Sequence, residues 1–221
     1  MREGRILVLE GLIGVGKSTL GRSLFRYFKK KGIDVHWMPE PINEKLLKLY
    51  LSNMQKYAFP FQVIVARERI QIYREAARLA EQGKFVIIDR GLPGDLAFAY
   101  MQKTKGFFTE EEFGVYLGLI DEEYPVPNTI IYLDCTVETA WKRILVRGIE
   151  PEKSSYNLTY LKDLQNSYRQ SLRKYPHFTI DWNLNSVVSR DVLSDELCER
   201  LLDMCHIECE TNIVQTSLSA R

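Results

Sequence analysis

A run of eight residues near the N-terminus has the spacing of a phosphate-binding loop: glycine, four residues, then glycine, lysine and serine. The glycines let backbone amides approach phosphate oxygens. The lysine brings positive charge to the outer phosphates, and the serine offers its hydroxyl to magnesium. A tight strand-to-helix turn would explain the glycines but not the lysine and serine. The sequence therefore predicts a site for a nucleoside triphosphate, formed by Gly11, Gly14, Val15, Gly16, Lys17, Ser18 and Thr19.

Two acidic residues follow apolar segments farther along the chain. Asp89 and Arg90 end the most apolar segment, and Glu40 lies between two prolines at the end of another. Ligands of open parallel sheets bind beyond the carboxyl ends of the strands. Asp89 could hold magnesium through water there, Arg90 could face phosphoryl charge, and Glu40 could accept a proton from an attacking hydroxyl. Taken alone, Asp89 and Arg90 could also form a surface ion pair, and Glu40 could be a solvated loop acid.

Arg143 and Arg147 are four residues apart and share one face of a predicted helix. The charged segment 147–153 breaks that helix and predicts a mobile flap. Phosphoryl transfer needs positive charge around the transferred group and exclusion of water, and a basic flap supplies both. A solvated helix face is the alternative interpretation of the two arginines.

A long predicted helix carries Gln62 and Arg69, which are seven residues apart and return to nearly the same face. An amide can hydrogen-bond the edge of a nucleobase, and an aromatic ring such as Phe61 or Phe98 can stack on it. An ordinary polar stripe on the helix is the alternative.

Apolar runs and helical periodicity alternate along the chain and predict the elements that position these residues. Helical crossovers between the strands predict one α/β domain around a mostly parallel sheet. A capping box is predicted at Thr109 and Glu112. The predicted strands are 5–10, 34–38, 85–88, 129–133 and 178–181. The predicted helices are 17–31, 42–51, 61–82, 96–102, 110–124, 137–147, 156–175 and 192–205.

Length and composition predict a single globular domain over residues 1–207, followed by a mobile tail over 208–221. The chain has 30 Lys and Arg against 29 Asp and Glu, so no global field attracts nucleic acid. No apolar run is long enough for a membrane span, and no secretory signal is present. We expect a cytoplasmic protein, with a cleaved organelle-targeting peptide left open. Cys198, Cys205, Cys209 and His206 lack metal-ligand spacing and predict half-buried helix cysteines.

These features together resemble the deoxyribonucleoside kinase family, which includes the deoxycytidine, deoxyguanosine and insect multisubstrate kinases. The resemblance runs from the first predicted strand to the last helix. It implies a P-loop kinase fold, with a five-stranded parallel sheet flanked by helices and a basic lid at about 147–156. Its markers, in order, are Glu10-Gly11 with the phosphate loop, Glu40-Pro41, the segment 57–62, Asp89-Arg90, and the segment 143–148.

The family resemblance also implies a reaction. ATP, with Mg²⁺, would phosphorylate the 5′-hydroxyl of a purine deoxynucleoside or deoxycytidine in nucleotide salvage, and the protein would be a homodimer. Glu40 would deprotonate the hydroxyl beside Arg90, and Lys17, Arg143 and Arg147 would hold the donor phosphates. Ser18 and Asp89 would serve the metal.

The nucleoside itself would be recognised by a second group of residues, again by resemblance. Gln62 would read the base. Arg69 and Asp95 match an ion pair above the base in members that accept cytosine or purines. Tyr50 and Glu152 would bind the sugar 3′-hydroxyl.

Three departures from the family pattern concern selectivity and donor binding more than the reaction. Gly91 replaces a serine, no tryptophan follows Glu40-Pro41, and Ile149 occupies the place of a third flap arginine. Two other functions stay open. A nucleoside monophosphate kinase related to thymidylate kinases would need extra positive charge for the acceptor phosphate. A non-catalytic nucleotide-binding protein would be expected to lack catalytic groups that are present here.

Overall fold

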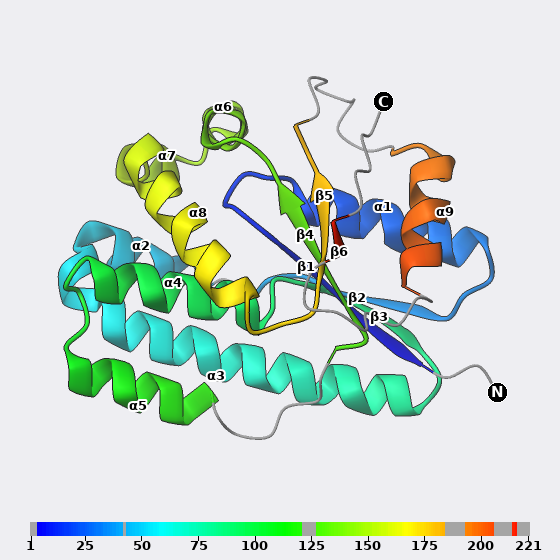
Figure 1. Ribbon diagram of the computed structural model, residues 1–221, viewed down its shortest axis with the longest axis horizontal. Coiled ribbons are helices and arrows are strands. Elements are labelled where there is room, and N and C mark those ends of the chain that lie inside the picture. Colours follow the sequence, from blue (N-terminus) through cyan, green and yellow to red (C-terminus); the bar gives the residue numbers. More distant parts are fainter. Residues whose placement is uncertain (1–3, 42, 121–126, 184–192, 206–213, 216–221) are drawn as a thin grey trace.

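The computed structural model describes residues 4–41, 43–120, 127–183, 193–205 and 214–215. Its central feature is a sheet of order β2-β3-β1-β4-β5-β6 in which every pair of neighbouring strands is parallel. Helices cover both faces (Figure 1). The strands are β1 (Arg5–Gly11), β2 (Val35–Met38), β3 (Phe85–Asp89), β4 (Thr129–Asp134), β5 (Phe178–Asp181) and β6 (Val214–Gln215).

The five predicted strands and their parallel arrangement are confirmed. The central strands β1, β3 and β4 are buried on both faces, which explains why they are continuous apolar runs, whereas β2 and β5 are partly exposed. The sixth strand, β6, was not predicted and consists of two residues from the segment predicted as a mobile tail. The remainder of that tail, 208–213 and 216–221, lies outside the described residues.

The eight predicted helices are present, with an additional short helix after the sixth, and the third helix extends into residues that were predicted as a loop. Residues 121–124, predicted as the end of one helix, lie outside the described residues. The helices are α1 (Lys17–Lys30), α2 (Glu44–Ser52), α3 (Met54–Glu81), α4 (Leu92–Thr104), α5 (Glu110–Ile120), α6 (Val137–Arg147), α7 (Glu150–Ser155), α8 (Leu158–Leu172) and α9 (Asp195–Met204).

Three helix boundaries were predicted wrongly, each next to a proline. The long helix α3 begins at Met54, seven residues before the predicted start, because the Asn53 side chain caps it, and it continues through Pro60. The helix α4 begins at Leu92 rather than 96, with Pro93 in its first turn. The flap predicted as a helix break contains α7, whose first turn holds Pro151. Proline fits the first turn because its missing N–H has no intrahelical partner there.

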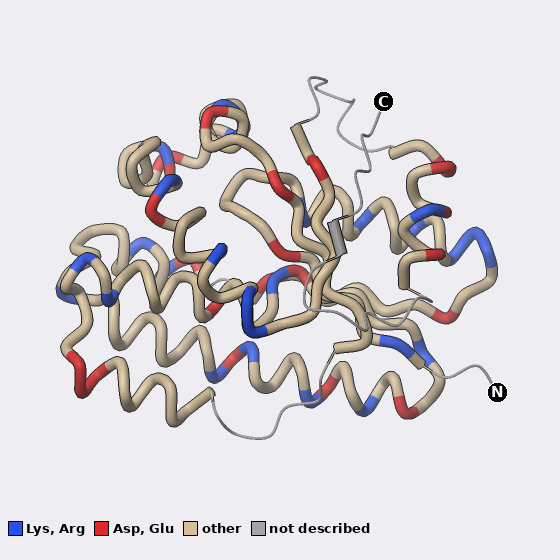
Figure 2. The backbone as a smooth tube through the Cα atoms, viewed as in Figure 1, with Lys and Arg blue, Asp and Glu red and all other residues tan. Residues whose placement is uncertain are grey.

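The core divides at the sheet. On one face Leu7, Leu9 and Ile87 pack with residues of α1 and α9, and on the other Val8 and Ile88 pack with residues of α3. Charged residues of both signs are interspersed along the outer helices (Figure 2). The predicted capping box is confirmed, because the Thr109 and Glu112 side chains each accept the other's backbone N–H.

No helix within the described part of the chain is long and apolar enough to cross a membrane. Cys198 and Cys205 are buried rather than half-buried, and His206 and Cys209 lie outside the described residues.

Candidate active site

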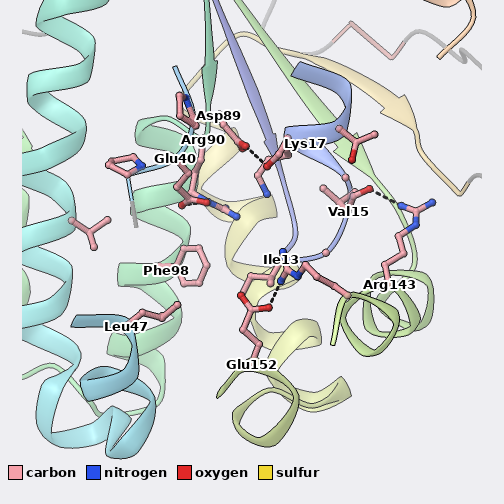
Figure 3. A pocket seen from close by; sticks show the side chains of 18 of the residues that line it. Ile13, Val15, Lys17, Glu40, Leu47, Asp89, Arg90, Phe98, Arg143 and Glu152 are labelled. Atoms are coloured by element: carbon pink, nitrogen blue, oxygen red, sulfur yellow. Dashed lines mark hydrogen bonds and ion pairs between the residues drawn. The ribbon is translucent and has the colours of Figure 1, made fainter. Parts of the chain in front are cut away.

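One cavity of about 1190 Å³ opens at the carboxyl ends of the strands. Figure 3 shows Lys17, Asp89 and Arg90 near Glu40, while Arg143 and Glu152 extend from helices on the other side. Every predicted site residue except Gly11 lines this cavity. Those residues are Gly14, Val15, Gly16, Lys17, Ser18, Thr19, Glu40, Tyr50, Phe61, Gln62, Arg69, Asp89, Arg90, Asp95, Phe98, Arg143, Arg147 and Glu152.

The phosphate loop joins β1 to α1 and is tightly packed. Gly14 and Gly16 have φ angles of 80° and 110°, a region that L side chains rarely adopt. A Cβ added at Gly14 would lie 2.7 Å from the carbonyl oxygen of Ala140. These glycines are therefore needed both for backbone conformation and for the close approach of α6.

The buried Lys17 side chain turns back onto its own loop. Its Nζ donates to the carbonyl oxygens of Gly11 (3.2 Å) and Leu12 (3.1 Å). Burial, together with the positive charge of Arg90, lowers the pKa of Lys17 to about 8. The lysine has no direct carboxylate partner in these contacts, so an anionic phosphate would supply charge that the protein does not.

Ser18 and Asp89 form a hydroxyl–carboxylate pair at the start of α1 and the end of β3. The Ser18 Oγ donates to Asp89 Oδ2 at 2.5 Å. The other oxygen, Asp89 Oδ1, is buried and has no hydrogen-bond partner among the residues that the structure describes. Hard oxygen ligands of this kind suit Mg²⁺, which usually takes only one or two protein oxygens and completes its shell with phosphate and water. The residues present therefore fit magnesium.

Glu40 follows β2 and is held by two arginines through a single oxygen. Its Oε1 accepts from Arg69 Nη2 at 2.6 Å and from Arg90 Nε at 2.8 Å. Burial alone would raise the pKa of Glu40, but the positive charges of Arg90 and Arg69 outweigh burial and lower it to about 2. Glu40 is therefore a carboxylate at neutral pH, with its second oxygen still available to a ligand.

Arg90 lies at the junction of β3 and α4 in a left-handed backbone conformation, with a φ of 66°. Its Nη1 donates to the carbonyl oxygen of Gly11 at 3.2 Å and also to the Tyr168 hydroxyl. The guanidinium lies 5.0 Å from the centre of the Phe98 ring. Several independent contacts thus fix its direction towards Glu40.

Gly91, where the family pattern has a serine, is fully enclosed. A Cβ there would lie 2.1 Å from the Tyr73 hydroxyl and 2.8 Å from Val8 Cγ1. That hydroxyl accepts a hydrogen bond from the backbone N–H of Leu92 at 3.3 Å. The Tyr73 hydroxyl therefore occupies the space that a serine side chain would need.

Arg69 connects two acids. Besides contacting Glu40, it places Nε 3.3 Å from Asp95 Oδ1, which confirms that the predicted ion pair forms. The geometry is not that of a hydrogen bond, so both atoms are buried without a hydrogen-bond partner among the described residues. The Tyr116 hydroxyl donates to the other Asp95 oxygen at 2.7 Å. Arg69 and Asp95 are thus paired with each other beside the cavity.

Gln62 is held from both sides of its amide. Its Nε2 donates to the backbone oxygen of Asp95, and its Oε1 accepts from Gln102 Nε2, each at 3.2 Å. The amide is therefore fixed in orientation, with one N–H and one oxygen lone pair left for other contacts.

Aromatic and lid residues enclose the far end of the cavity. The rings of Tyr50 and Phe61 are stacked, with centroids 4.5 Å apart. Glu152 on α7 forms an ion pair with Arg147 at the end of α6. Arg143 instead donates to the backbone oxygens of Val15 (2.6 Å) and Trp182 (3.1 Å). One flap arginine thus contacts the lid acid, and the other contacts the phosphate loop.

The sequence predictions missed several residues of this region. Glu10 is completely buried and bonds the start of α4 and the Tyr168 hydroxyl. An acid inside an apolar strand is a signal, because buried charges need partners, although it does not identify them. Tyr73 and Tyr168 gave no such signal. The cavity is also lined by Arg22, Trp37, Lys142 and Trp182.

A triphosphate loop at the end of β1, with an acid and an arginine at the end of the adjacent β3, defines the class of P-loop kinases. In this class a nucleoside triphosphate donates a phosphoryl group to a second molecule bound in the same site.

Comparison with known proteins specifies the family. The sequence profile of the deoxynucleoside kinases matches residues 7–206, and the chain belongs to this family. The protein is therefore a transferase that phosphorylates deoxynucleosides with ATP.

Individual relatives agree with this assignment. The chain is 29% identical to a deoxyadenosine kinase of Dictyostelium discoideum over 192 residues, covering 82% of this chain and 74% of the relative. It is 28% identical to a deoxyguanosine kinase of Lactobacillus acidophilus over 217 residues, covering 90% and 92%. The fold resembles that of the M. mycoides deoxyadenosine kinase, with a TM-score of 0.72 at 22% identity, covering 90% and 99%.

Proposed function

We propose that this protein transfers the γ-phosphate of ATP to the 5′-hydroxyl of a deoxynucleoside, with purine deoxynucleosides and deoxycytidine preferred. The observation that carries the proposal is Glu40. Its ionised carboxylate lies in the same cavity as the phosphate loop, and two arginines engage only one of its oxygens. A hydroxyl placed at the other oxygen would face both a proton acceptor and the donor site.

The chemistry needs little covalent participation by the protein, because phosphoryl transfer depends on positioning and charge. Glu40 accepts the 5′-proton, and Arg90 orients Glu40 and faces the reacting oxygen. Lys17 leaves the carbonyls of its loop for the outer phosphates, and Arg143 and Arg147 neutralise the donor from the lid side. Ser18 and Asp89 would hold Mg²⁺, which would neutralise phosphate charge.

The acceptor end supports a purine or cytosine base. Arg69 and Asp95 form an ion pair beside the cavity, and the family resemblance associates this pair with members that accept cytosine or purines. Gln62 adds an amide of fixed orientation, which can hydrogen-bond the edge of a base. The relatives named above are a deoxyadenosine and a deoxyguanosine kinase, and the structure of M. mycoides deoxyadenosine kinase contains dCMP.

A substrate panel tests the acceptor directly. We expect ATP-dependent turnover of deoxyadenosine, deoxyguanosine or deoxycytidine and much slower turnover of thymidine, measured by coupled ADP release. The four deoxynucleoside monophosphates form the matched panel. Turnover of the monophosphates alone would identify a nucleoside monophosphate kinase and reject the proposal. Binding of ATP without transfer to either panel would identify a non-catalytic nucleotide-binding protein.

Glu40→Gln tests the proton acceptor. The amide retains size but cannot take up a proton, so we expect kcat to fall by about 10²–10⁴, with ATP affinity unchanged. Turnover and ATP binding by calorimetry are the two measurements, and unfolding by urea checks that the variant is folded. Wild-type kcat in a folded Glu40→Gln variant would contradict the role of Glu40.

We also infer a homodimer located in the cytoplasm. The family resemblance supports the homodimer, and light scattering of the purified protein tests the oligomeric state.

Omission of Mg²⁺ should abolish turnover.

A further inference from the structure

Glu10 is an acid that the proposed reaction does not use, although the Tyr168 hydroxyl connects it to Arg90. It is in β1, immediately before the phosphate loop, and none of its surface is exposed. Its Oε1 accepts from the backbone N–H groups of Gly91 (2.8 Å) and Gly94 (2.9 Å) in the first turn of α4. The N-cap residue Gly91 has no side chain to perform this task, so a residue from another strand caps α4.

The second oxygen of Glu10 extends the network to α8. The Tyr168 hydroxyl donates to Glu10 Oε2 at 3.0 Å, and the same hydroxyl accepts from Arg90 Nη1. Tyr168 is completely buried. One hydroxyl can donate once and accept from other groups, so the bond to Glu10 sets the direction of the lone pair that receives Arg90.

Space around this hydroxyl is limited. A Cβ at Gly94 would lie 2.5 Å from Glu10 Oε2, 2.7 Å from Arg90 Cγ and 2.7 Å from the Tyr168 oxygen. The glycine thus permits the acid, the hydroxyl and the arginine stem to meet at one point. Arg90 is also held in a left-handed backbone conformation that residues other than glycine rarely adopt. Such a conformation persists only where the surroundings fix it.

We propose that Tyr168, oriented by Glu10, is a positioning residue that holds the Arg90 guanidinium against Glu40. The phenol fixes Nη1 on one side of the guanidinium, while Nε donates to Glu40 at 2.8 Å. This inference rests on the proposed place of Arg90 beside the reacting oxygen. It adds to the reaction two residues, one on β1 and one on α8, that do not line the cavity.

Tyr168→Phe tests the link, because it removes one hydroxyl and keeps the ring. We expect kcat to fall about tenfold, the KM for ATP to change less than twofold, and the urea midpoint to change no more than in a control. The control is Tyr132→Phe, whose ring lies 5.5 Å from that of Tyr168 in the same packing layer and whose hydroxyl bonds neither Glu10 nor Arg90 in the described structure.

The decisive measurement repeats Tyr168→Phe in an Arg90→Lys background. If the phenol acts through Arg90, the tenfold loss disappears there, because residues that act as a unit are not additive. A loss of the same factor in both backgrounds, or wild-type kcat in Tyr168→Phe, would overturn the inference. Wild-type turnover is measured first with the full acceptor panel, so that a wrong acceptor assignment is recognised separately. The comparison of Tyr168→Phe in the two backgrounds then uses an acceptor that the wild-type protein turns over.

If kcat of Arg90→Lys is too low to measure, Glu10→Gln and Tyr168→Phe are compared instead, singly and combined. Glu10→Gln keeps an oxygen for the two N–H groups of α4 and loses the acceptor for the phenol. We expect Glu10→Gln combined with Tyr168→Phe to be no slower than the slower single variant. Multiplication of the two losses would show independent effects and reject the chain from Glu10 through Tyr168 to Arg90.

Discussion

One residue of the site, Lys17, is held in surroundings that oppose the stability of the unliganded protein. Its side chain is buried against two carbonyls and lies near the positive charge of Arg90. Its pKa in the folded protein, about 8, is below the ordinary value of 10.5. The unfolded chain therefore binds more protons than the folded one between pH 8 and 10.5, and stability from this group rises with pH through that window. Below pH 8 the full penalty of the buried charge remains.

Lys17→Met should consequently stabilise the unliganded protein at pH 7 by about 1–3 kcal/mol, after allowance for two lost hydrogen bonds, while abolishing turnover. The gain should shrink towards pH 10, where the wild-type lysine is neutral in the folded state. Urea unfolding at pH 7 and pH 10, without nucleotide, measures both values. Lys48→Met, at an exposed position on α2, is the control and should change stability by less than about 0.5 kcal/mol. Destabilisation of Lys17→Met at pH 7 would contradict the argument.

At the scale of single residues, the spacing of sequence motifs decided which site residues could be predicted. Residues whose neighbours in sequence take part in the same chemistry, such as Lys17 with Ser18 and Asp89 with Arg90, were found from the sequence. Glu10, in contrast, bonds Gly91, which is 81 positions along the chain, and Tyr168, which is 158 positions along. No local pattern encodes such partners, because they are brought together only by the folded sheet and by α8.

At the scale of helices and strands, the sequence predicted the strands well and the helix starts poorly. The central strands β1, β3 and β4 are short buried runs, which burial on both faces makes conspicuous. The start of α3 was misplaced because the segment with Pro60 was interpreted as the opening of the helix. The helix α4 was predicted without its first turn, which holds Pro93, and α7 was missed because the segment with Pro151 was interpreted as a helix break. The position of a proline relative to the first turn depends on the residue that caps the helix. The side chain that caps α4 is Glu10, which belongs to β1.

The junction of β3 and α4 makes a specific prediction about the glycine that departs from the family pattern. Gly91→Ser should destabilise the protein by about 1–3 kcal/mol, since its Cβ would meet the Tyr73 hydroxyl. Removing that hydroxyl makes room, so Gly91→Ser with Tyr73→Phe should recover part of the loss, measured by urea unfolding of all four proteins. Contact with Val8 remains in the double variant, which is why recovery is partial. Strictly additive losses would mean that the hydroxyl is not what excludes a serine.

For the whole molecule, the strand order explains why the two substrates meet where they do. The phosphate loop follows β1 and Glu40 follows β2, and β3 lies between these strands. Neighbouring strands are about 4.8 Å apart, so the donor and acceptor ends are separated by roughly 10 Å. The intervening strand β3 ends at Asp89 and is followed by Arg90. These two residues therefore lie between the donor and acceptor ends. The order was not predictable from the sequence, because pairing of strands distant along the chain leaves no local pattern.

The cavity walls also contain two of the three tryptophans of the chain, and both lie close to the start of α1. The Trp182 Nε1 lies 3.3 Å from the Cβ position of Gly16, and Trp37 packs so closely on α1 that a Cβ at Gly21 would overlap its ring. The protein consequently contains its own optical probe. We expect ATP to change the intrinsic fluorescence, and Trp182→Phe to remove most of that change while Trp141→Phe leaves it intact. An equal response in both variants would place the reporter elsewhere; the expected outcome would allow donor binding to be followed in real time without a label.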